Sequence, residues 1–331
     1  MRGDILKKKL MILCAVAVMI STCLSGCGSS SNEIRFGSAG IGGTYQVFGD
    51  TFANLVTSNS KKYNIEVKTT AGSAANLRLL SKDYIQMAVA QMDLINDAYD
   101  RTGIFENDKK YQGYRAVASL YTEACQIVVP ADSSIKTIED LEGKKVSIGE
   151  EESGTEQNAL QILSAYGLNA KLVGTINLDY TAAAKKLKSG EIDALFCTAG
   201  VQTTVINELA KQRNVRFISL DQKGINRLKK SYKFYTEYTM PANTYANQTK
   251  PVKTVGVKAV LLASDKLSEE TIKDITKLLF QHEQEIQYAL PVDISLDEKT
   301  AIEGITIPFH DGAAAYYKQH GITVNTEKGS N

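Results

Sequence analysis

The sequence is poor in the residues that most often mark a catalytic or metal site. Its 331 residues include no tryptophan, three histidines and five cysteines. The histidines are scattered without metal-ligand spacing; they are His282, His310 and His320. Neither Cys125 nor Cys197 has a histidine close to it in the sequence that could activate a thiol nucleophile. These absences argue against an enzyme, and they leave no motif for a metal or another cofactor.

An excess of charge of one sign is also missing. Lysine and arginine number 38 against 37 aspartates and glutamates, so the formal net charge is +1. This balance gives no sign of the basic surface that binds nucleic acid. With 43% apolar and 23% charged residues, the composition is that of a globular protein, and the length allows about two domains.

Residues 1–26 differ from the rest and predict a signal peptide. Three lysines precede an uncharged apolar run, Leu10–Leu24, and a polar tract follows at residues 28–32. The run of about 15 residues is short for a membrane-spanning helix, which needs about 20; an uncleaved anchor is the alternative. The ending Leu24-Ser-Gly-Cys27 resembles a bacterial lipobox. That resemblance implies cleavage before Cys27, lipidation of its thiol and a flexible tether over residues 27–32.

Cleavage would change the charge and the cysteine content of the mature chain. It removes four basic residues and one acidic residue, which takes the formal net charge from +1 to −2. Cys125 and Cys197 then remain beside the lipidated Cys27. A disulfide between them is allowed outside the cytoplasm. Because both lie in apolar stretches typical of strands, two buried free thiols are at least as well supported.

A glycine-rich turn, Ser38–Tyr45, is a candidate anion site. Ile34–Gly37 is predicted as a strand before it, and apolar residues at helical spacing predict a helix after it, with Thr44 near the cap position. The first turn of a helix offers unpaired N–H donors and a partial positive charge to a small anion. The turn lacks the lysine of a P-loop and the third glycine of a dinucleotide-binding turn. We therefore expect a small anion there and not a nucleotide.

The same arrangement of strand, small-residue turn and helix recurs along the chain. Strands are predicted to end at four later turns, Ala71–Asn76, Gln91–Asp93, Ser153–Thr155 and Thr198–Gly200. This alternation predicts βαβ units and a largely parallel sheet in each half of an α/β protein. Ligands of such sheets bind at the carboxyl ends of the strands. We therefore expect these turns to meet in one binding site.

The number and order of these motifs resemble one known family along nearly the whole mature chain. Gly40–Tyr45, Ala71–Ser73, Val89–Asp93, Ser153–Glu156 and Asp193–Gly200 resemble the TAXI family, the extracytoplasmic solute receptors of one class of TRAP transporters. The resemblance implies a type II periplasmic-binding-protein fold, with two α/β lobes joined by a hinge and the ligand in the cleft. Lobe I would comprise residues 33–122 plus 237–331, and lobe II residues 123–236. The crossing strands would lie near Tyr121–Val128 and Tyr235–Met240.

The resemblance also implies the ligand contacts, which come from both lobes: Gly43, Thr44, Tyr45, Gly72, Ser73, Gln91, Gly154, Thr155 and Gly200. For the hydroxyls of Thr44, Ser73 and Thr155 the alternative is helix capping, and Tyr45 is alternatively a core aromatic residue. Arg78 follows the second turn, but on a helix it is expected to face solvent. Glu150–Glu152 reads as a solvated acidic loop at the mouth of the cleft.

The function that the resemblance implies is solute uptake. A lipoprotein on the outer face of the cell membrane would capture a small organic anion, either an amino acid such as glutamate or glutamine or a related dicarboxylate or oxo acid. It would deliver this ligand to TRAP membrane subunits, which run on an ion gradient. The alternatives are a sensory lipoprotein that presents its ligand to a membrane receptor, and an ABC-type receptor with the same fold.

Overall fold

The part of the chain that the structure describes contains a mixed ten-stranded sheet. The computed structural model describes residues 33–108, 111–290, 292 and 296–327, so the predicted signal peptide and Cys27 lie outside it. The strands are β1 (Glu33–Gly37), β2 (Asn64–Lys68), β3 (Met87–Gln91), β4 (Tyr114–Pro130), β5 (Lys145–Ser147), β6 (Gly174–Ile176), β7 (Ala194–Ala199), β8 (Val215–Phe217), β9 (Thr236–Met240) and β10 (Val252–Ser264).

Helices follow most of these strands, as the alternating pattern predicts. They are α2 (Thr44–Asn59), α3 (Ser73–Ser81), α4 (Met92–Asp100), α5 (Gly154–Ala165), α6 (Tyr180–Ser189), α7 (Thr204–Gln212), α8 (Gln222–Ser231), α9 (Glu269–Gln281), α10 (Glu283–Ala289) and α11 (Asp311–Gln319). Short 3₁₀ turns lie at Gly103–Phe105, Glu139–Leu141 and Thr300–Ile302. None of the helices in these described ranges is long and apolar enough to cross a membrane.

The sheet is parallel toward its two ends and antiparallel in the middle. Its strand order is β2-β1-β3-β10-β4-β7-β5-β6, with β8 on β4 and β9 on β10. The pairs β1–β3, β5–β6 and β5–β7 are parallel, which agrees with the predicted βαβ units. The pairs β10–β3, β10–β4 and β4–β7 are antiparallel. The two halves are therefore joined through two long strands, β4 and β10.

Both long strands contribute to more than one hydrophobic core. In β4, residues up to Tyr121 belong to the core that contains β1, β3 and α2, whereas residues from Cys125 onward belong to the cores around β5 and β7. In β10 the change falls between Val257 and Ala259. Each half of the chain thus has its own core, and the two halves share two strands. This is the two-lobe α/β architecture that the sequence motifs predicted.

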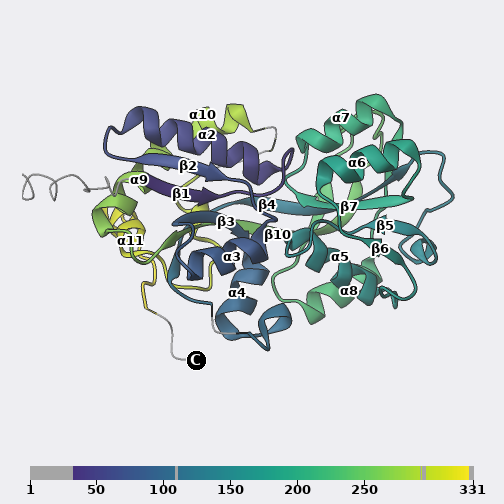
Figure 1. The fold of residues 1–331 in the computed structure, drawn as a ribbon, viewed down its shortest axis with the longest axis horizontal. Coiled ribbons are helices and arrows are strands. Elements are labelled where there is room, and N and C mark those ends of the chain that lie inside the picture. Colours follow the sequence, from purple (N-terminus) through teal and green to yellow (C-terminus); the bar gives the residue numbers. More distant parts are fainter. Residues whose placement is uncertain (1–32, 109–110, 291, 293–295, 328–331) are drawn as a thin grey trace, which may run out of the picture. The chain divides into compact units, whose positions relative to one another are not determined.

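In the second half of the chain, alternate residues of β4 face two helical layers. Cys125, Ile127 and Val129 pack with residues of α5 and α8, whereas Val128 packs with residues of α6 and α7. This period of two follows from the pleat of a strand. Figure 1 shows α6 and α7 on one side of this part of the sheet and α5 and α8 on the other. A near-continuous apolar run is the sequence signature of a strand covered on both faces.

The return to the first lobe differs from the expectation. Met240, Tyr245 and Val252 pack in the core that contains α6 and α7, although the predicted boundary assigns residues from 237 onward to lobe I. β9 pairs only with the first part of β10, from Val252 to Gly256. The second crossing strand is therefore β10, and not a strand near Tyr235–Met240. The division into lobes stays a prediction, and the packing favours a boundary close to Lys258.

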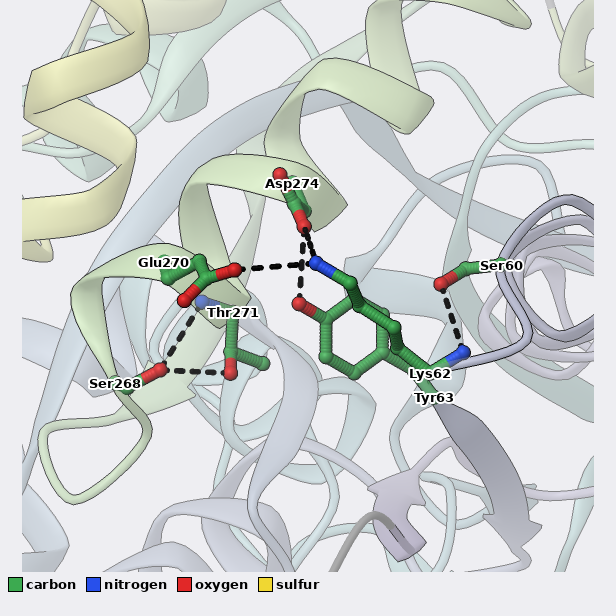
Figure 2. Close-up of polar contacts among 7 residues, drawn as sticks. All are labelled: Ser60, Lys62, Tyr63, Ser268, Glu270, Thr271 and Asp274. Atoms are coloured by element: carbon green, nitrogen blue, oxygen red, sulfur yellow. Dashed lines mark hydrogen bonds and ion pairs between the residues drawn. The ribbon is translucent and has the colours of Figure 1, made fainter.

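Helix α9 is tied to the turn between α2 and β2 by surface contacts. Figure 2 shows Lys62 between two carboxylates, with Nζ 3.1 Å from Glu270 Oε1 and 3.5 Å from Asp274 Oδ2. The Tyr63 hydroxyl donates to Asp274 Oδ2 at 3.0 Å. Ser268 caps α9 by accepting from the Thr271 backbone N–H. Because these ion pairs are exposed, each contributes little to the stability of the fold.

We predict that Phe48→Ala lowers the free energy of unfolding by about 3–5 kcal/mol. Phe48 is fully buried, and its ring stacks on Phe52 at 5.4 Å and lies 6.2 Å from the ring of Phe36. Urea unfolding followed by circular dichroism measures the loss. The control Tyr288→Ala removes a ring that is 89% exposed, so it should change stability by no more than about 0.5 kcal/mol. Equal effects of the two substitutions would contradict the assignment of this core.

Candidate functional site

The predicted turns meet at one cavity. Eight of the nine predicted contact residues line it: Gly43, Thr44, Tyr45, Gly72, Ser73, Gln91, Gly154 and Thr155. They come from the starts of α2, α3 and α5 and from the end of β3. The volume of the cavity that water can occupy is about 40 Å³, which corresponds to roughly three water molecules. The cavity is thus suited to a small ligand.

Gly200 does not line this cavity, and its neighbours Thr198 and Ala199 do. A Cβ added to Gly200 would collide with the side chain of Val292 and would lie 3.4 Å from Thr44 Oγ1. The glycine therefore allows close packing behind the cavity wall. The prediction of a ligand contact at this turn fits better one and two residues earlier, at Ala199 and Thr198.

The three predicted hydroxyls are not helix caps. The N-cap residues are Gly43, Gly72 and Ser153, and of these only Ser153 caps through its side chain, by accepting from the Glu156 N–H at 3.0 Å. Thr44 and Ser73 lie one residue after the N-cap, and Thr155 lies two residues after it. All three are therefore inside the first turn of a helix. The simple capping alternative is therefore excluded for these hydroxyls.

Two of these hydroxyls are held by partners within the protein. Ser73 Oγ accepts from the Gln91 backbone N–H at 3.1 Å, which ties α3 to the end of β3. Thr155 Oγ1 lies 2.5 Å from the Tyr180 hydroxyl and accepts from the Thr198 N–H at 3.2 Å. Thr44 Oγ1 is different, because it is buried without a hydrogen-bond partner among the described residues. Among the three hydroxyls, that of Thr44 is the one open to a ligand.

Two glycines allow the cavity walls to approach each other. Gly72 has φ of +126° and ψ of −145°, a conformation that favours glycine, and a Cβ there would lie 3.5 Å from Ser153. A Cβ on Gly154 would collide with the side-chain amide of Gln91. Gly72 and Gln91 belong to the first half of the chain, whereas Ser153 and Gly154 belong to the second. The glycines are thus placed where the two halves meet.

The start of α3 is occupied by a carbonyl group from across the cavity. The backbone N–H groups of Ala74 and Ala75 donate to the backbone carbonyl oxygen of Glu152 at 3.1 and 3.2 Å. We expected these donors to face a ligand, but they hold the two halves of the chain together. No such carbonyl covers the start of α2 or α5 in the described ranges, so those two helices retain first-turn N–H donors.

Arg78 supports this contact and does not reach the cavity. Its Nε lies 2.9 Å from Glu152 Oε1, and its NH1 group pairs with Asp108 and donates to the Tyr111 hydroxyl. The guanidinium also lies over the ring of Phe105, 4.9 Å from its centroid. Glu152 is thus bound both at its carbonyl and at its carboxylate, which agrees only in part with the expected solvated acidic loop. The expectation that Arg78 faces solvent is wrong, because its side chain is only 21% exposed and is held by these partners. It does not line the cavity.

The residue that sequence analysis missed is Glu123. It lies in the middle of β4, it lines the cavity and it is only 1% exposed. Gln91 Nε2 donates to its Oε2 at 2.6 Å, whereas Oε1 has no hydrogen-bond partner among the described residues. The sequence signal was available, because Glu123 is a charged residue in the middle of a largely apolar strand. Lys, Glu, Arg and Asp are almost never fully buried unless they are paired.

Burial raises the pKa of Glu123 to about 8. Hydrogen bonding by Gln91 and the nearby Tyr45 hydroxyl lower it, and the charge of Asp93 raises it. Asp93 is itself buried, which raises its pKa to about 6, and it accepts from Asn158 Nδ2 at 3.2 Å. A carboxyl of this kind holds its proton near neutral pH until a positive charge or a strong donor comes close.

Acidic side chains line the cavity, and among the described residues no basic side chain does. The acidic residues are Glu123, Glu150 and Asp179, and none of the described residues in the lining is lysine, arginine or histidine. Burial and the charge of Asp179 raise the pKa of Glu150. Positive potential in the cavity therefore comes from helix starts alone. Tyr45 lines the cavity and is also part of the first core, so the two interpretations of this residue are compatible.

The structure offers little for covalent or metal chemistry in its described ranges. No group of three or more histidine, cysteine, aspartate and glutamate side chains there could hold a metal ion. Cys125 and Cys197 are buried free thiols on the neighbouring strands β4 and β7. Burial raises the pKa of both, that of Cys197 to about 12, so neither thiol is readily ionised.

Comparisons with known proteins agree with this architecture. The model of a family described as NMT1-like matches residues 36–321. A Bordetella bronchiseptica RB50 protein of solved structure is 16% identical, with a TM-score of 0.53 over 91% of this chain and 86% of its own. A Listeria monocytogenes protein, provisionally described as an L-cystine ABC transporter, is 15% identical, with a TM-score of 0.51 over 80% of this chain and 98% of its own.

At these identities the likeness concerns the fold alone. Two lobes, each with its own core, share the crossing strands β4 and β10. The chain has the type II periplasmic-binding-protein fold that the sequence motifs predicted.

We predict that the stability of the protein falls as the pH rises from about 5 to 8, and that Glu123→Gln removes much of this dependence. The pKa of Glu123 is about 8 in the folded protein against an ordinary 4.5, so the folded state binds the proton more tightly than the unfolded state. The stabilisation is complete below the ordinary pKa and is lost as the pH passes through 8. Its upper limit is roughly 5 kcal/mol.

Urea unfolding at pH 5, 6, 7 and 8 measures this effect. The Glu123→Gln variant should have a flatter profile and should exceed the original protein in stability at pH 8. Asp93→Asn serves as the comparison, because the pKa of Asp93 is raised only to about 6 and its effect ends at lower pH. An unchanged pH profile in Glu123→Gln would show that this carboxyl is not held as the geometry requires.

Proposed function

Because the chain belongs to the NMT1-like family, we propose that it is an extracytoplasmic solute-binding protein, which holds a small solute between its two lobes. The observation that carries the proposal is the cavity at the lobe junction. Residues from both halves of the chain line it. Thr44 Oγ1, Gln91 Oε1 and Glu123 Oε1 are buried there without hydrogen-bond partners among the described residues. Buried polar atoms of this kind are costly unless a ligand or water satisfies them.

The proposed ligand is a small organic acid, either an amino acid such as glutamate or glutamine or a dicarboxylate or oxo acid. The starts of α2 and α5 supply N–H donors to a carboxylate. Each helix start contributes about 0.3–1 kcal/mol, or about 2 kcal/mol where it is partly buried. A micromolar ligand needs about 8 kcal/mol. The buried polar side chains and the exclusion of water by the closed lobes must supply the difference.

We propose capture and release, not catalysis. The hydroxyl of Thr155 is engaged by Tyr180 and Thr198, and that of Ser73 by Gln91, so neither is paired with a general base. The thiols are buried and protonated. The polar groups of the cavity suit recognition of a ligand.

For delivery of the solute we propose TRAP membrane subunits, and the sequence motifs that resemble the TAXI family support this choice. An ABC transporter is the second candidate, favoured by the description of the Listeria monocytogenes protein that shares the fold. In either case the protein would work outside the cytoplasm, attached to the membrane by a lipid on Cys27. The lipid anchor rests on the Leu24-Ser-Gly-Cys27 motif.

We predict that a small organic acid raises the melting temperature of the mature chain. At 100 times its Kd, a ligand stabilises the folded state by about 2.7 kcal/mol. A thermal-shift screen with amino acids, dicarboxylates, oxo acids, sugars and metal ions tests this. Stabilisation by sugars or cations alone would contradict the proposed ligand class.

The variant Gly154→Ala should weaken binding of the ligand found in that screen by about 1–3 kcal/mol, because the added methyl group overpacks the contact with Gln91. Titration calorimetry measures the affinity. The control Gly321→Ala adds the same methyl group where no atom lies within 4 Å. Its φ of +77° makes this change costly to folding, but the affinity of the folded protein should be unchanged. Equal affinity in the two variants would remove the cavity as the binding site.

We predict that uptake of the ligand by the source cells depends on an ion gradient and not directly on ATP. Uptake of radiolabelled ligand should continue when ATP is depleted and an ion gradient is imposed, and it should stop when an ionophore collapses the gradient. Cells that lack this protein provide the background. The opposite response would replace the TRAP proposal by the ABC alternative: uptake would stop when ATP is depleted and would continue in the presence of the ionophore.

A further inference from the structure

Glu123 occupies an unusual place for a carboxylate. Its neighbours in β4 on the two sides, Tyr121 and Cys125, belong to different cores. The carboxyl group therefore lies at the lobe junction, inside the cavity and shielded from bulk water. Burying a charged group without compensation is costly. The Gln91 amide compensates only one of the two carboxyl oxygens.

Two of the three unpartnered atoms in the cavity are carbonyl or carboxyl oxygens, and the third belongs to a hydroxyl. Gln91 Oε1 can only accept, and so can Glu123 Oε1 while the carboxylate is ionised. The hydroxyl oxygen of Thr44 can accept as well. All three residues line the cavity, and each is at most 3% exposed. An ammonium group carries three N–H donors and no acceptor. The three oxygens can together accept as many hydrogen bonds as an ammonium group donates.

The donors of the cavity are backbone N–H groups at the starts of helices, whereas the acceptors are side-chain oxygens. The first-turn N–H groups of α2 and α5 are not covered by a protein carbonyl in the described ranges, and helix starts favour a carboxylate. The cavity thus combines acceptors from β3 and β4 with donors from helix starts. A zwitterion complements both sets.

The competing interpretation is a protonated Glu123 that donates to a carboxylate of the ligand. Against it stands the charge of the cavity, because Glu150 and Asp179 line it beside Glu123, and among the described residues no lysine, arginine or histidine does. A dicarboxylate would bring two further negative charges to this cavity without any cationic side chain to neutralise them. An ammonium group is attracted by the same carboxylates.

We propose that Glu123, supported by Gln91, binds the ammonium group of the ligand, so that the cavity selects amino acids over the corresponding 2-oxo acids and dicarboxylates. The inference rests on the proposed function, because it names the solute class of the same cavity. Glu123 is then the residue that determines specificity, and the helix starts hold the carboxylate that both ligand classes share.

This assignment couples binding to the release of a proton. The pKa of Glu123 is about 8 without a bound cation, so the group is mostly protonated at pH 7, and an ammonium group requires the ionised form. The titratable groups that face Glu123 are Tyr45 of α2, Asp93 of α4, Tyr121 and Cys125 of β4, Tyr180 of α6 and Cys197 of β7. Burial keeps the phenols and thiols neutral, and Asp93 is the facing group that is charged above pH 6.

The sign of the pH dependence distinguishes the two ligand classes. As the pH is raised toward 8, affinity for an ammonium ligand should increase about tenfold per pH unit, and above pH 8 it should level off, because the ionised carboxyl is the competent form. Affinity for a ligand that needs a protonated Glu123 would be constant below pH 8 and would fall above it.

The test uses matched pairs of probes, L-glutamate with 2-oxoglutarate and L-alanine with pyruvate, together with L-glutamine and glutarate. Titration calorimetry of the mature chain at pH 6, 7 and 8 gives the affinities. Repetition at pH 7 in phosphate and in Tris gives the number of protons released. We expect an amino acid to bind at least 30-fold more tightly than its 2-oxo partner, as for loss of a buried charge partner, and to release nearly one proton.

The variant Glu123→Gln separates specificity from folding, because it retains the size of the side chain and is expected to be stable. It should lose the preference for the amino acid, the pH dependence and the proton release together. Glu123→Asp retains the charge and should restore part of the preference. The control Glu303→Gln removes an exposed carboxylate and should change none of the three readouts.

The outcomes are distinct for the two proposals. If 2-oxoglutarate, pyruvate or glutarate binds as well as the amino acids, or if Glu123→Gln retains the preference, the role of Glu123 is refuted and the solute-binding function stands. If no probe binds to the mature chain, both this inference and the proposed ligand class are refuted.

Discussion

The antiparallel pairing of β4 with β10 is the constraint on which the rest of the structure depends. These are the longest strands, with 17 and 13 residues, and each crosses from one core to the other. Val257 pairs with Glu123, and Gly256 pairs with Ala124, at the crossing. A Cβ on Gly256 would collide with the Thr122 side chain and would lie 3.1 Å from the backbone carbonyl oxygen of Glu123. The two lobes are thus joined by paired backbone, which limits their relative motion to bending of these strands.

A carboxylate at this crossing is poorly explained by stability. Apolar side chains fill β4 on both sides of Glu123, and replacing a buried charge by an apolar residue is often neutral or stabilising. The position lies in neither core, so the cost of the charge falls where the cavity forms. A group that costs stability and lines a cavity is better explained by ligand recognition. The buried pair Asp93–Asn158 also joins the two halves near this position.

The sequence predicted the cavity better than its chemistry. Local periodicity identifies strands followed by helices, and the carboxyl ends of parallel strands converge in such folds, so Thr44, Gln91 and Gly154 could be expected together. Two features depend on contacts between distant residues and had no local signal. The Glu152 carbonyl takes the N–H donors of α3, and β10, not the segment near Met240, returns to the first lobe. Glu123 did have a signal, because it is a charged residue between two largely apolar segments of β4.

Closure and recognition depend on the same few contacts. Gln91 comes from the end of β3, orients Glu123 through its amide nitrogen and packs against Gly154 of the opposite lobe. Separation of the lobes would remove Gly154 from this amide and would also free the start of α3 from Glu152. The open form would then expose Glu123 to water, where its pKa moves toward the ordinary value. A cationic group bound at Glu123 supplies in the closed form what water supplies in the open one. If Glu123 binds the ligand as proposed, the ligand that satisfies this carboxyl is also the ligand that makes closure favourable.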